Sequence, residues 1–496
     1  MFNKKLNLFN LLTGIWFLFV AALIIFFTDK KVFSYRRYFL LPNTVLFLIG
    51  AAFLLCILFL SRLIKNTKIG AVLSDVASKP ATVRIFFVVF FIFQLLVCYG
   101  AYFETAWDVK MVLDNARILA DAGILASPDY FSTYPNNLFL LKFVSGIFSV
   151  FGNSKGLCVL LVISALFNCL SGFCTFRVMR RFFGVGRAWL GLLFWLILTG
   201  TSPWILVPYS DSMSVVFPIL IIDLVLAGKE ASRNKKLLLY IIASILAAIA
   251  FRIKPQAFIV VIALIICELP AIFKPGNKSV KAAFIAIPCL TLVLSFFFTG
   301  VWARHSFNLD KEKQFTFTHF LMMGSSFEHD GIYNDDDVSY SASFSTVKER
   351  QKANLEVFGA RISSMGPNIF KHLATKLRVC FHDGTFEWGG DESFYHTIYP
   401  EKLPVISRVS RVILYGGGIF QKSAETIRQC FWLVTLALLG ISALFRSKKE
   451  TAFLFLAVIG LTAFLLIFEA NARYLFSNIP LFIVTALSFK LPSKQV

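Results

Sequence analysis

Long apolar runs alternate with short basic clusters along most of this chain. A helix needs about 20 mostly apolar residues to cross a bilayer, and a series of runs meets or approaches that length. These runs centre on residues 11–27, 43–61, 84–102, 138–151, 157–176, 188–207, 213–228, 237–251, 256–273, 283–301, 429–445, 451–468 and 474–489. The pattern predicts an all-α polytopic membrane protein with about twelve transmembrane helices.

The basic clusters between the runs indicate which side of the membrane each loop faces, because cytoplasmic loops carry the excess of Lys and Arg. The clusters are RLIKNTK (62–68), RVMRRFFGVGR (177–187), KEASRNKK (229–236), KPGNKSVK (274–281) and RSKK (446–449). We therefore place these clusters and both termini in the cytoplasm. The loops on the opposite face are then 103–136, 203–212, 252–255, 302–428 and 469–473.

Two features conflict with this topology. The runs 138–151 and 157–176 separate an outer loop from the inner cluster at 177–187, where only an odd number of crossings fits. The first run is shorter and contains Lys142, so we expect a partial or interfacial helix there; the alternative is that the cluster breaks the charge rule. The outer segment between the first two runs, 11–27 and 43–61, also carries basic residues that the rule places inside. They are Lys30, Lys31, Arg36 and Arg37.

The runs divide the chain into four parts. Residues 1–83 hold two additional N-terminal spans, 84–301 form a membrane core with a first outer loop at 103–136, and 429–496 hold the C-terminal spans. Between them, residues 302–428 form a long segment that is close to charge-balanced and contains all six histidines. This length is enough for a small extracytoplasmic region, and loops held by a rigid scaffold often carry function.

Composition narrows the class of protein further. Hydrophobic residues make up 57% of the chain and Phe occupies 57 of 496 positions, which is more apolar surface than a water-soluble core can bury. The net charge of +21 lies mainly in the clusters between apolar runs, which argues against nucleic-acid binding. Most of the nine cysteines lie within apolar runs, so neither a disulfide framework nor a metal site follows.

The stretch FETAWDVKMVLDNA (103–116) places an acid directly after an apolar run. A helix over 108–122 would carry a stripe of charged residues on one face at i, i+4, i+7 and i+11 spacing. These residues are Lys110, Asp114, Arg117 and Asp121. Asp108 then points to the opposite, apolar side, where an acid is costly and usually functional. The alternative is that Thr105 and Asp108 form a capping box and that Trp107 is an aromatic-belt anchor.

The order of several short motifs resembles that of the membrane glycosyltransferases with the GT-C fold. After the Trp-Asp pair the motifs are TYPNN (133–137), PYSDS (208–212), FRIKP (251–255), HFLMMGSS (319–326) and EANARYLFSNIP (469–480). Each motif is short, and their order and sidedness carry the resemblance, from about residue 84 to the C-terminus. Within that fold the chain is most similar to the family 39-like group of protein O-mannosyltransferases and aminoarabinose transferases and to its Gram-positive relatives.

The resemblance implies that a sugar is transferred from a polyprenyl-phosphate carrier to an acceptor hydroxyl on the outer face of a bacterial, Gram-positive cell membrane. The position that matches the family's catalytic acid is Asp108, which would accept the proton of the attacking hydroxyl as general base. A single displacement of this kind inverts the anomeric carbon. The acceptor would be a cell-envelope glycan, a teichoic-acid-like polymer or a protein, and membrane lipid would surround the enzyme.

A lipid phosphate leaving group needs fixed cations at the bilayer surface. Arg473 is the leading candidate, because arginine binds phosphate through two parallel donors. Arg252 and Lys254 lie on the same predicted face and would hold the same phosphate, or they are snorkelling interfacial residues. Asp211 matches a second acid of the fold and would orient an acceptor or a cation, unless it caps the next helix together with Ser210.

Three other residues are candidates for substrate contacts. Tyr134 and Asn136 belong to TYPNN, although Pro135 also fits the first turn of a helix. His319 would contact the acceptor or the carrier phosphate, although a lone loop histidine is more often solvated or satisfied locally. The acidic cluster NDDDV (334–338) lacks the Gly and the terminal Glu of a calcium loop, so we interpret it as a solvated turn.

The neighbourhood of Asp108 bears on metal dependence. The family often has two adjacent acids in this loop, whereas here Trp107 is the neighbour and Glu104 lies one turn earlier. Glu104 remains a candidate for substrate binding. We therefore expect neither a metal nor another cofactor.

Two other classes of membrane protein compete with this hypothesis. A cell-envelope polysaccharide polymerase or ligase also has many spans and a large outer loop, but it should be rich in outer arginines and lack the early Asp helix. A polytopic transporter should carry charges at mid-span. The charges here cluster at interfaces, and Asp223 is the main exception.

Overall fold

The computed structural model describes residues 7–27, 39–269, 278–305, 307–389, 394–445 and 449–489. Within these ranges the chain is mainly helical, with one antiparallel pair of two-residue strands, β1 (Phe103–Glu104) and β2 (Thr397–Ile398). The basic residues between the first two runs (Lys30, Lys31, Arg36 and Arg37), and parts of the clusters at 274–281 and 446–449, lie outside the described residues.

Helices of membrane-spanning length and composition are frequent in the described chain. Eight qualify: Leu8–Phe27 (α1), Asn43–Ile64 (α2), Pro80–Ala101 (α4), Asn153–Phe183 (α8), Ser210–Lys229 (α10, Ser210–Ser214, with α11, Phe217–Lys229), Arg233–Ile253 (α12), Ile285–Arg304 (within α14, Lys278–Arg304) and Ile419–Leu444 (α20). Four shorter apolar helices are Pro135–Phe151 (η1, Pro135–Asn137, with α7, Leu138–Phe151), Val185–Gly200 (α9, Val185–Trp195, with η2, Leu196–Gly200), Pro255–Glu268 (η4, Pro255–Phe258, with α13, Ile259–Glu268) and Ala452–Ile467 (α21). The all-α polytopic class is confirmed, and the number of crossings stays a prediction.

The run predicted at 188–207 is not one continuous span. α9 is followed by the π-helical turn η2 and, after a break, by the 3-10 helix η3 (Pro203–Leu206). The π turn frees backbone carbonyls from the regular ladder, and buried amides satisfy them. Gln94 donates to the carbonyl of Gly200 at 2.8 Å, and Asn168 donates to that of Thr199 at 3.1 Å. Such satisfaction is required where a membrane helix is broken.

The last predicted span, 474–489, also differs. It consists of the 3-10 helix η8 (Ala472–Asn478) and the short helix α22 (Ile479–Ala486), whose eight residues are all buried. At about 1.5 Å per residue, α22 is too short to cross a bilayer. The sequence was apolar enough for a span because the segment lies inside the protein, packed against α8, α9, α20 and α21.

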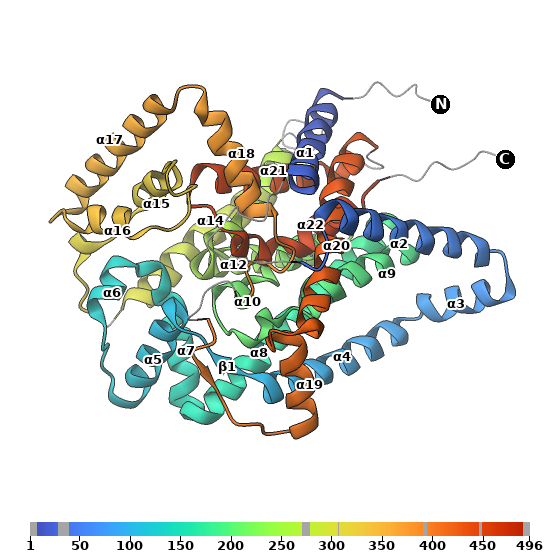
Figure 1. Cartoon of the computed structure of the whole chain (residues 1–496), viewed down its shortest axis with the longest axis horizontal. Helices are drawn as coiled ribbons and strands as arrows, with labels where there is room; N and C mark the ends of the chain where they lie inside the picture. The colour runs from blue at the N-terminus through green and yellow to red at the C-terminus, as the bar shows by residue number, and fades with distance from the viewer. Residues whose placement is uncertain are drawn as a thin grey trace.

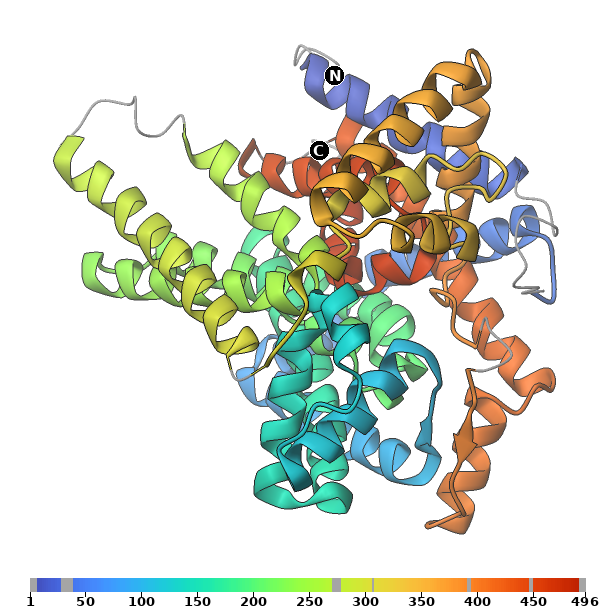
Figure 2. The same ribbon diagram turned by 90° about the vertical axis from the view of Figure 1, so that its left-hand side faces the viewer.

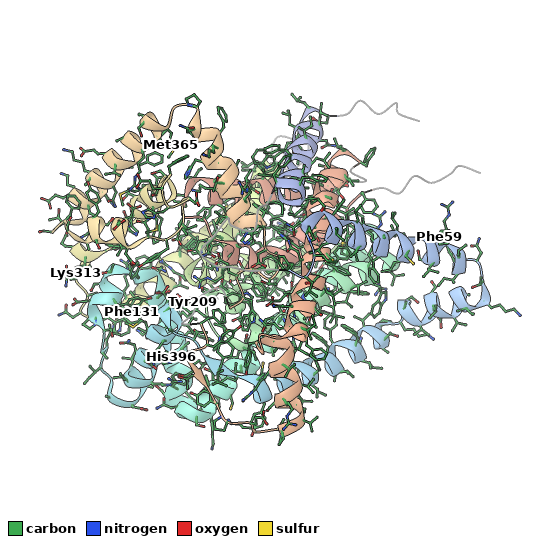
Figure 3. All side chains as sticks on the ribbon, viewed as in Figure 1. Phe59, Phe131, Tyr209, Lys313, Met365 and His396 are labelled. Carbon is green, nitrogen blue, oxygen red and sulfur yellow. The ribbon has the colours of Figure 1, made fainter. Side chains whose placement is uncertain are left out.

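Two groups of helices extend away from the centre of the molecule. α2 and α4 form one of them, joined at their far end by α3 (Lys68–Ser78), which follows the basic cluster at 62–68 (Figure 1). Figure 3 shows Phe59 of α2 at this periphery, whereas Tyr209 lies near the middle of the molecule. α12, α13 and α14 form the second group, which projects from the body in Figure 2. Their outward faces are apolar and suit contact with lipid.

The segment between α14 and α20 folds into helices. It contains η6 (Lys311–Lys313), α15 (Phe317–Gly324), α16 (Asp335–Ala342), α17 (Val347–Met365), α18 (Asn368–Phe381) and α19 (Pro404–Leu414). We call residues 317–381 the α15–α18 lobe; it gathers on one side of the molecule (Figure 1). The solvated turn expected at 334–338 is wrong, because Asn334 caps α16 and Asp337 is buried against Arg361 at 2.7 Å.

Candidate functional site

One cavity of about 1120 Å³ collects most of the residues that the sequence singled out. Its wall is built from segments far apart in the chain: the start of α5 (Trp107–Ala122), α6 (Pro128–Thr133) with η1, the turn between α12 and η4, the end of α14, the start of α15 and the turn after α21. Of the predicted site residues, the lining contains Asp108, Tyr134, Asn136, Arg252, Lys254 and Arg473.

Asp108 lies in the first turn of α5 and faces this cavity. The capping-box alternative is wrong, because the N-cap is Ala106 and no side chain caps the helix. Trp107 adopts a left-handed backbone conformation (φ 57°), which is unfavourable for a bulky residue and must be held by its surroundings. Its ring packs edge-on against Phe394, with the ring centroids 5.1 Å apart, and lies under the guanidinium of Arg473. Trp107 is therefore part of the cavity wall.

The charged stripe of α5 forms largely as expected. Lys110 and Arg117 each contact Asp114, at 2.8 and 2.9 Å. Asp121 accepts instead from the side chain of Asn153 at 2.7 Å. The stripe neutralises itself and leaves Asp108 on another face of the helix, as the periodicity predicts.

A chain of hydrogen bonds from uncharged side chains holds the Asp108 carboxylate. The Tyr130 hydroxyl donates to Asp108 Oδ1 at 2.6 Å and accepts from Asn137 Nδ2 at 2.7 Å. The Tyr209 hydroxyl donates in turn to Asn137 Oδ1 at 2.9 Å. A donor hydroxyl stabilises the ionised carboxylate and fixes one of its oxygens. The other oxygen has no hydrogen bond to any side chain or backbone group that the structure describes, and it remains available to a ligand.

Sequence reasoning missed these three partners. Asn137 stands beside Asn136 in TYPNN, so a signal was present but the neighbouring amide was chosen. Tyr130 and Tyr209 carry no spacing signal that links them to Asp108. Tyr134 packs its ring against that of Tyr130, with centroids 5.3 Å apart, and burial raises its pKa to about 12. Pro135 begins η1, as the alternative interpretation of TYPNN predicted.

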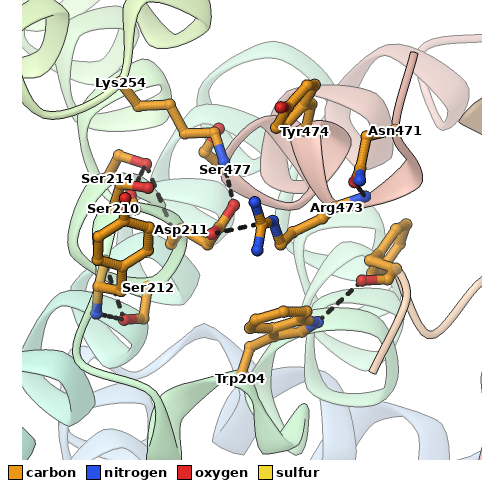
Figure 4. Close-up of polar contacts among 12 residues, drawn as sticks. Trp204, Ser210, Asp211, Ser212, Ser214, Lys254, Asn471, Arg473, Tyr474 and Ser477 are labelled. Atoms are coloured by element: carbon orange, nitrogen blue, oxygen red, sulfur yellow. Dashed lines mark hydrogen bonds and ion pairs between the residues drawn. The ribbon is translucent and has the colours of Figure 1, made fainter. Parts of the chain in front are cut away.

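The predicted cations Lys254 and Arg473 share one acid (Figure 4). Asp211, at 1% exposure, forms an ion pair with Lys254 Nζ, and its Oδ2 lies 3.6 Å from Arg473 Nε. Asp211 is not a cap, since α10 is capped by Tyr209 and Ser212. Two cations around one carboxylate leave one net positive charge beside the cavity, and Arg473 Nε has no hydrogen bond to described atoms.

Arg252 lines the same cavity as Lys254 and Arg473, but it does not contact Asp211. Its Nη2 donates to the carbonyl of Phe296 at 2.7 Å, and its side chain lies flat against Gly300, where a Cβ would come within 2.3 Å of Nη2. Lys254 follows the end of α12 in an extended conformation, which directs its ammonium to Asp211 instead. Arg252 and Lys254 therefore approach the cavity with separate partners.

Two further acids lie beside Arg473. Glu469 is 8% exposed and accepts a hydrogen bond from the Tyr474 hydroxyl at 2.9 Å. Glu387 sits in a tight turn with φ of 60° and also lines the cavity. Desolvation raises the pKa of both carboxyls, that of Glu387 to about 7, although the Arg473 charge opposes the shift. Neither acid was predicted as a site residue.

Glu104 and His319 lie outside the cavity lining. Glu104 is ion-paired with Arg117 and accepts from the Tyr399 hydroxyl at 2.8 Å, so it ties α5 to the segment after β2. His319 is buried, with Nδ1 2.7 Å from Ser341 Oγ and its ring against Phe315. Burial lowers the pKa of His319 to about 4, so the ring is neutral at physiological pH. The structure does not bring either residue to the site.

Metal-ligating side chains do not gather in threes anywhere in the part of the chain that the structure describes. The nine cysteines are free thiols. The cavity is lined by the Asp108 carboxylate, which accepts from Tyr130, by the basic side chains of Arg252, Lys254 and Arg473, and by aromatic rings. Such a surface suits a ligand with an anionic group at one end and hydroxyls nearby.

Comparison with known proteins places the chain in a membrane setting. The family described as "Conserved hypothetical integral membrane protein" matches residues 3–493. No curated protein matches the chain. Two crystal structures are similar to it, both of ArnT from Cupriavidus metallidurans, one in the apo state and one bound to undecaprenyl phosphate. Identity is 12% in both, coverage is 82% and 83% of this chain and 77% of the ArnT chain, and the TM-scores are 0.33 and 0.34. A likeness of this size carries no argument about function.

Proposed function

The chain belongs to the family of conserved hypothetical integral membrane proteins, and we propose that it is a GT-C-type glycosyltransferase that moves a sugar from a polyprenyl-phosphate carrier to an acceptor hydroxyl. One observation supports this proposal above the others. Asp108 and Arg473 are 365 positions apart in the sequence, yet both line one cavity, and the Arg473 guanidinium lies 5.6 Å from the ring of Trp107, the neighbour of Asp108.

In the proposed reaction the acceptor hydroxyl attacks the anomeric carbon of the donor while Asp108 takes its proton as general base. A bond forms between the acceptor oxygen and the anomeric carbon, and the bond from that carbon to the phosphate oxygen breaks. Tyr130 keeps Asp108 Oδ1 occupied, which leaves the second oxygen for the proton. The direct displacement inverts the anomeric carbon.

The leaving phosphate group gains negative charge as its bond breaks, and fixed cations stabilise that charge best when they are already in place. Arg473 and Lys254 supply them, and Asp211 holds both in position while cancelling only one of their two charges. Arg252 also lines the cavity and would add a third positive charge near the carrier phosphate. Aromatic rings of the wall, among them Trp107 and Tyr134, suit the faces of a sugar ring.

The setting of the site fits a lipid-borne donor. Arg252 lies in the last turn of the apolar helix α12 and Lys254 is its C-cap. Phe464 and Phe468 at the end of α21 also line the cavity. A carrier lipid could therefore present its head group to the cations while its chain stays among apolar helices. The outer face of a bacterial cell membrane and a cell-envelope acceptor remain part of this proposal.

The direct test is Asp108→Asn in the full-length protein, reconstituted in membranes with a radiolabelled polyprenyl-phosphate sugar. Loss of a general base should reduce transfer by about 100-fold or more, with the protein still monodisperse and donor binding retained. Asp121→Asn is the matched control, because Asp121 lies on the same helix and contacts Asn153 at its surface. Normal transfer by Asp108→Asn would refute the mechanism, and substrate flux without glycosyl transfer would favour a transporter.

A further inference from the structure

Lys376 is a buried lysine without an acidic partner. It lies on α18 in the α15–α18 lobe, at 0% exposure, and no carboxylate of the described residues lies within ion-pair distance of its ammonium. The ammonium donates instead to two backbone carbonyls, those of Gly324 and Phe468, at 2.6 Å each. An ion buried in this way is costly, so its contacts must contribute more than ordinary packing.

Both carbonyls belong to helix C-termini. Gly324 is the last residue of α15, and Phe468 is the C-cap of α21. The C-terminal end of a helix carries partial negative charge from its unpaired carbonyls, and a cation placed there is favourable. One ammonium therefore joins the end of a lobe helix to the end of an apolar helix of the membrane domain.

Other contacts close the same junction. The amide of Ala470 donates to the carbonyl of Gly331 at 2.8 Å, and His372 Nε2 lies 3.0 Å from the carbonyl of Gly324. A Cβ on Gly324 would come within 2.5 Å of the Phe468 carbonyl, so only glycine allows the two helix ends to approach this closely. The junction is thus a tight backbone contact with an ammonium at its centre.

The segment that follows this junction carries the site. Phe468 is succeeded by Glu469, which lines the cavity, and three residues after Ala470 comes Arg473, the proposed phosphate ligand. We propose that Lys376 is a positioning residue, which fixes the turn at 468–473 by joining the ends of α15 and α21 and so places Arg473 in the cavity. This inference rests on the proposed function for its catalytic consequence, but its structural part stands alone.

The structural part is tested by hydrogen exchange on the full-length protein. Lys376→Met keeps the length of the side chain and removes its donors. Amides of 468–473 should then exchange at least about tenfold faster, because one charged hydrogen bond contributes about 1.5 kcal/mol or more. Lys371→Met is the matched control, since Lys371 is exposed on the same helix, and it should leave the exchange unchanged. Unchanged exchange in Lys376→Met would overturn the proposal.

The catalytic part is tested by separating the two KM values. A displaced Arg473 should raise the KM for the polyprenyl-phosphate donor and lower kcat, while the KM for the acceptor stays constant. A merely destabilised protein would lose active molecules, which lowers kcat and leaves both KM values as they are; that result would refute a positioning role. If the wild type shows no transfer at all, the proposed function fails while the exchange experiment still decides the role of Lys376.

A second variant guards against a misfolded Lys376→Met. Gly324→Ala leaves the ammonium in place but puts a Cβ against the Phe468 carbonyl, so the two helix ends must separate. It should speed exchange in 468–473 and raise the donor KM in the same direction. Gly359→Ala on α17 is its control, because a Cβ there meets nothing within 4 Å. Identical behaviour of the two glycine variants would contradict the inference.

Discussion

Two buried aspartates on consecutive helices bind their cations in different ways. Asp211 on α10 and Asp223 on α11 are 1% and 2% exposed, and each contacts two basic side chains. The partners of Asp223 come from one helix, α8, where Arg177 and Arg181 lie four residues apart, at 3.2 and 2.9 Å. This cluster is local, because a single helix turn delivers both cations.

The partners of Asp211 come from distant parts of the chain. Lys254 follows α12, and Arg473 lies in the turn after α21. The side chains of Lys254 and Arg473 are 5% and 19% exposed. Of the two partners of Asp223, Arg181 is also 19% exposed, whereas 42% of the Arg177 side chain reaches the surface. Only the Asp211 cluster borders the large cavity. The Asp223 cluster thus joins α11 to α8. The Asp211 cluster, in our proposal, binds phosphate.

Removing each aspartate should separate the two roles most strongly. Asp211→Asn leaves two enclosed cations without their counter-charge and should lower the free energy of unfolding by about 3–5 kcal/mol. Asp223→Asn leaves Arg177, which is 42% exposed, and Arg181, which keeps Glu230 as a partner, so a smaller loss of about 1 kcal/mol is expected. Thermal unfolding of both variants in one detergent gives the difference. Equal losses, or a larger loss for Asp223→Asn, would contradict the distinction.

Removing one cation from each cluster should further distinguish the Asp211 cluster from the Asp223 cluster. Arg473→Gln should weaken binding of a labelled polyprenyl phosphate by about 100-fold, because a charged hydrogen bond to phosphate is worth about 1.5–3 kcal/mol and the long-range attraction is lost as well. Arg181→Gln should leave the affinity unchanged, since Arg181 contacts Asp223 and Glu230. Binding measured in the same nanodiscs compares them. Equal affinity of Arg473→Gln and wild type would exclude Arg473 as the phosphate ligand.

Removing the uncharged hydrogen-bond partner of Asp108 should have a smaller effect than removing Arg473. Tyr130→Phe removes the hydrogen bond to Asp108 but keeps the ring, and kcat should fall by about tenfold, the factor that corresponds to one hydrogen bond. Donor affinity should remain, because the cations are untouched. Tyr99→Phe is a suitable control, since Tyr99 is exposed and distant from the cavity lining. A fall in donor affinity instead of kcat would place Tyr130 in binding.

Much of the site was predictable because charge in an apolar chain is informative. Asp108, Lys254 and Arg473 stand out against their neighbours, and the i, i+4 spacing on α5 indicated which face Asp108 would take. The long apolar helices could also be predicted, because their runs of apolar residues are long and continuous. Pairings between distant segments were not, because nothing in local spacing links Asp211 to Arg473 or Tyr130 to Asp108.

The errors have a common physical origin. Hydropathy measures how apolar a segment is, and it does not distinguish contact with lipid from burial in protein. The segment 474–489 was therefore predicted as one lipid-facing span, whereas the structure divides it into η8 and the buried helix α22. The basic cluster at 62–68 does contain a turn, between the end of α2 at Ile64 and the start of α3 at Lys68, but the sequence pattern did not indicate α3 itself. His319 and Glu104 were chosen by residue type, but their partners satisfy them away from the cavity.

The smallest expected effect concerns Glu387, the acid beside the Asp211 cluster. Burial raises its pKa from 4.5 to about 7, so the folded protein holds this proton more tightly than the unfolded chain does. Between about pH 4.5 and 7 the folded state therefore binds more protons, and stability must fall as pH rises through this window. Glu387→Gln carries no titrating proton and should lack this slope. Its Tm should exceed that of the wild type by a few degrees at pH 8 and by less at pH 5. If the Tm values of wild type and Glu387→Gln ran parallel from pH 5 to pH 8, the Glu387 carboxyl would not be desolvated, and water would reach this part of the cavity.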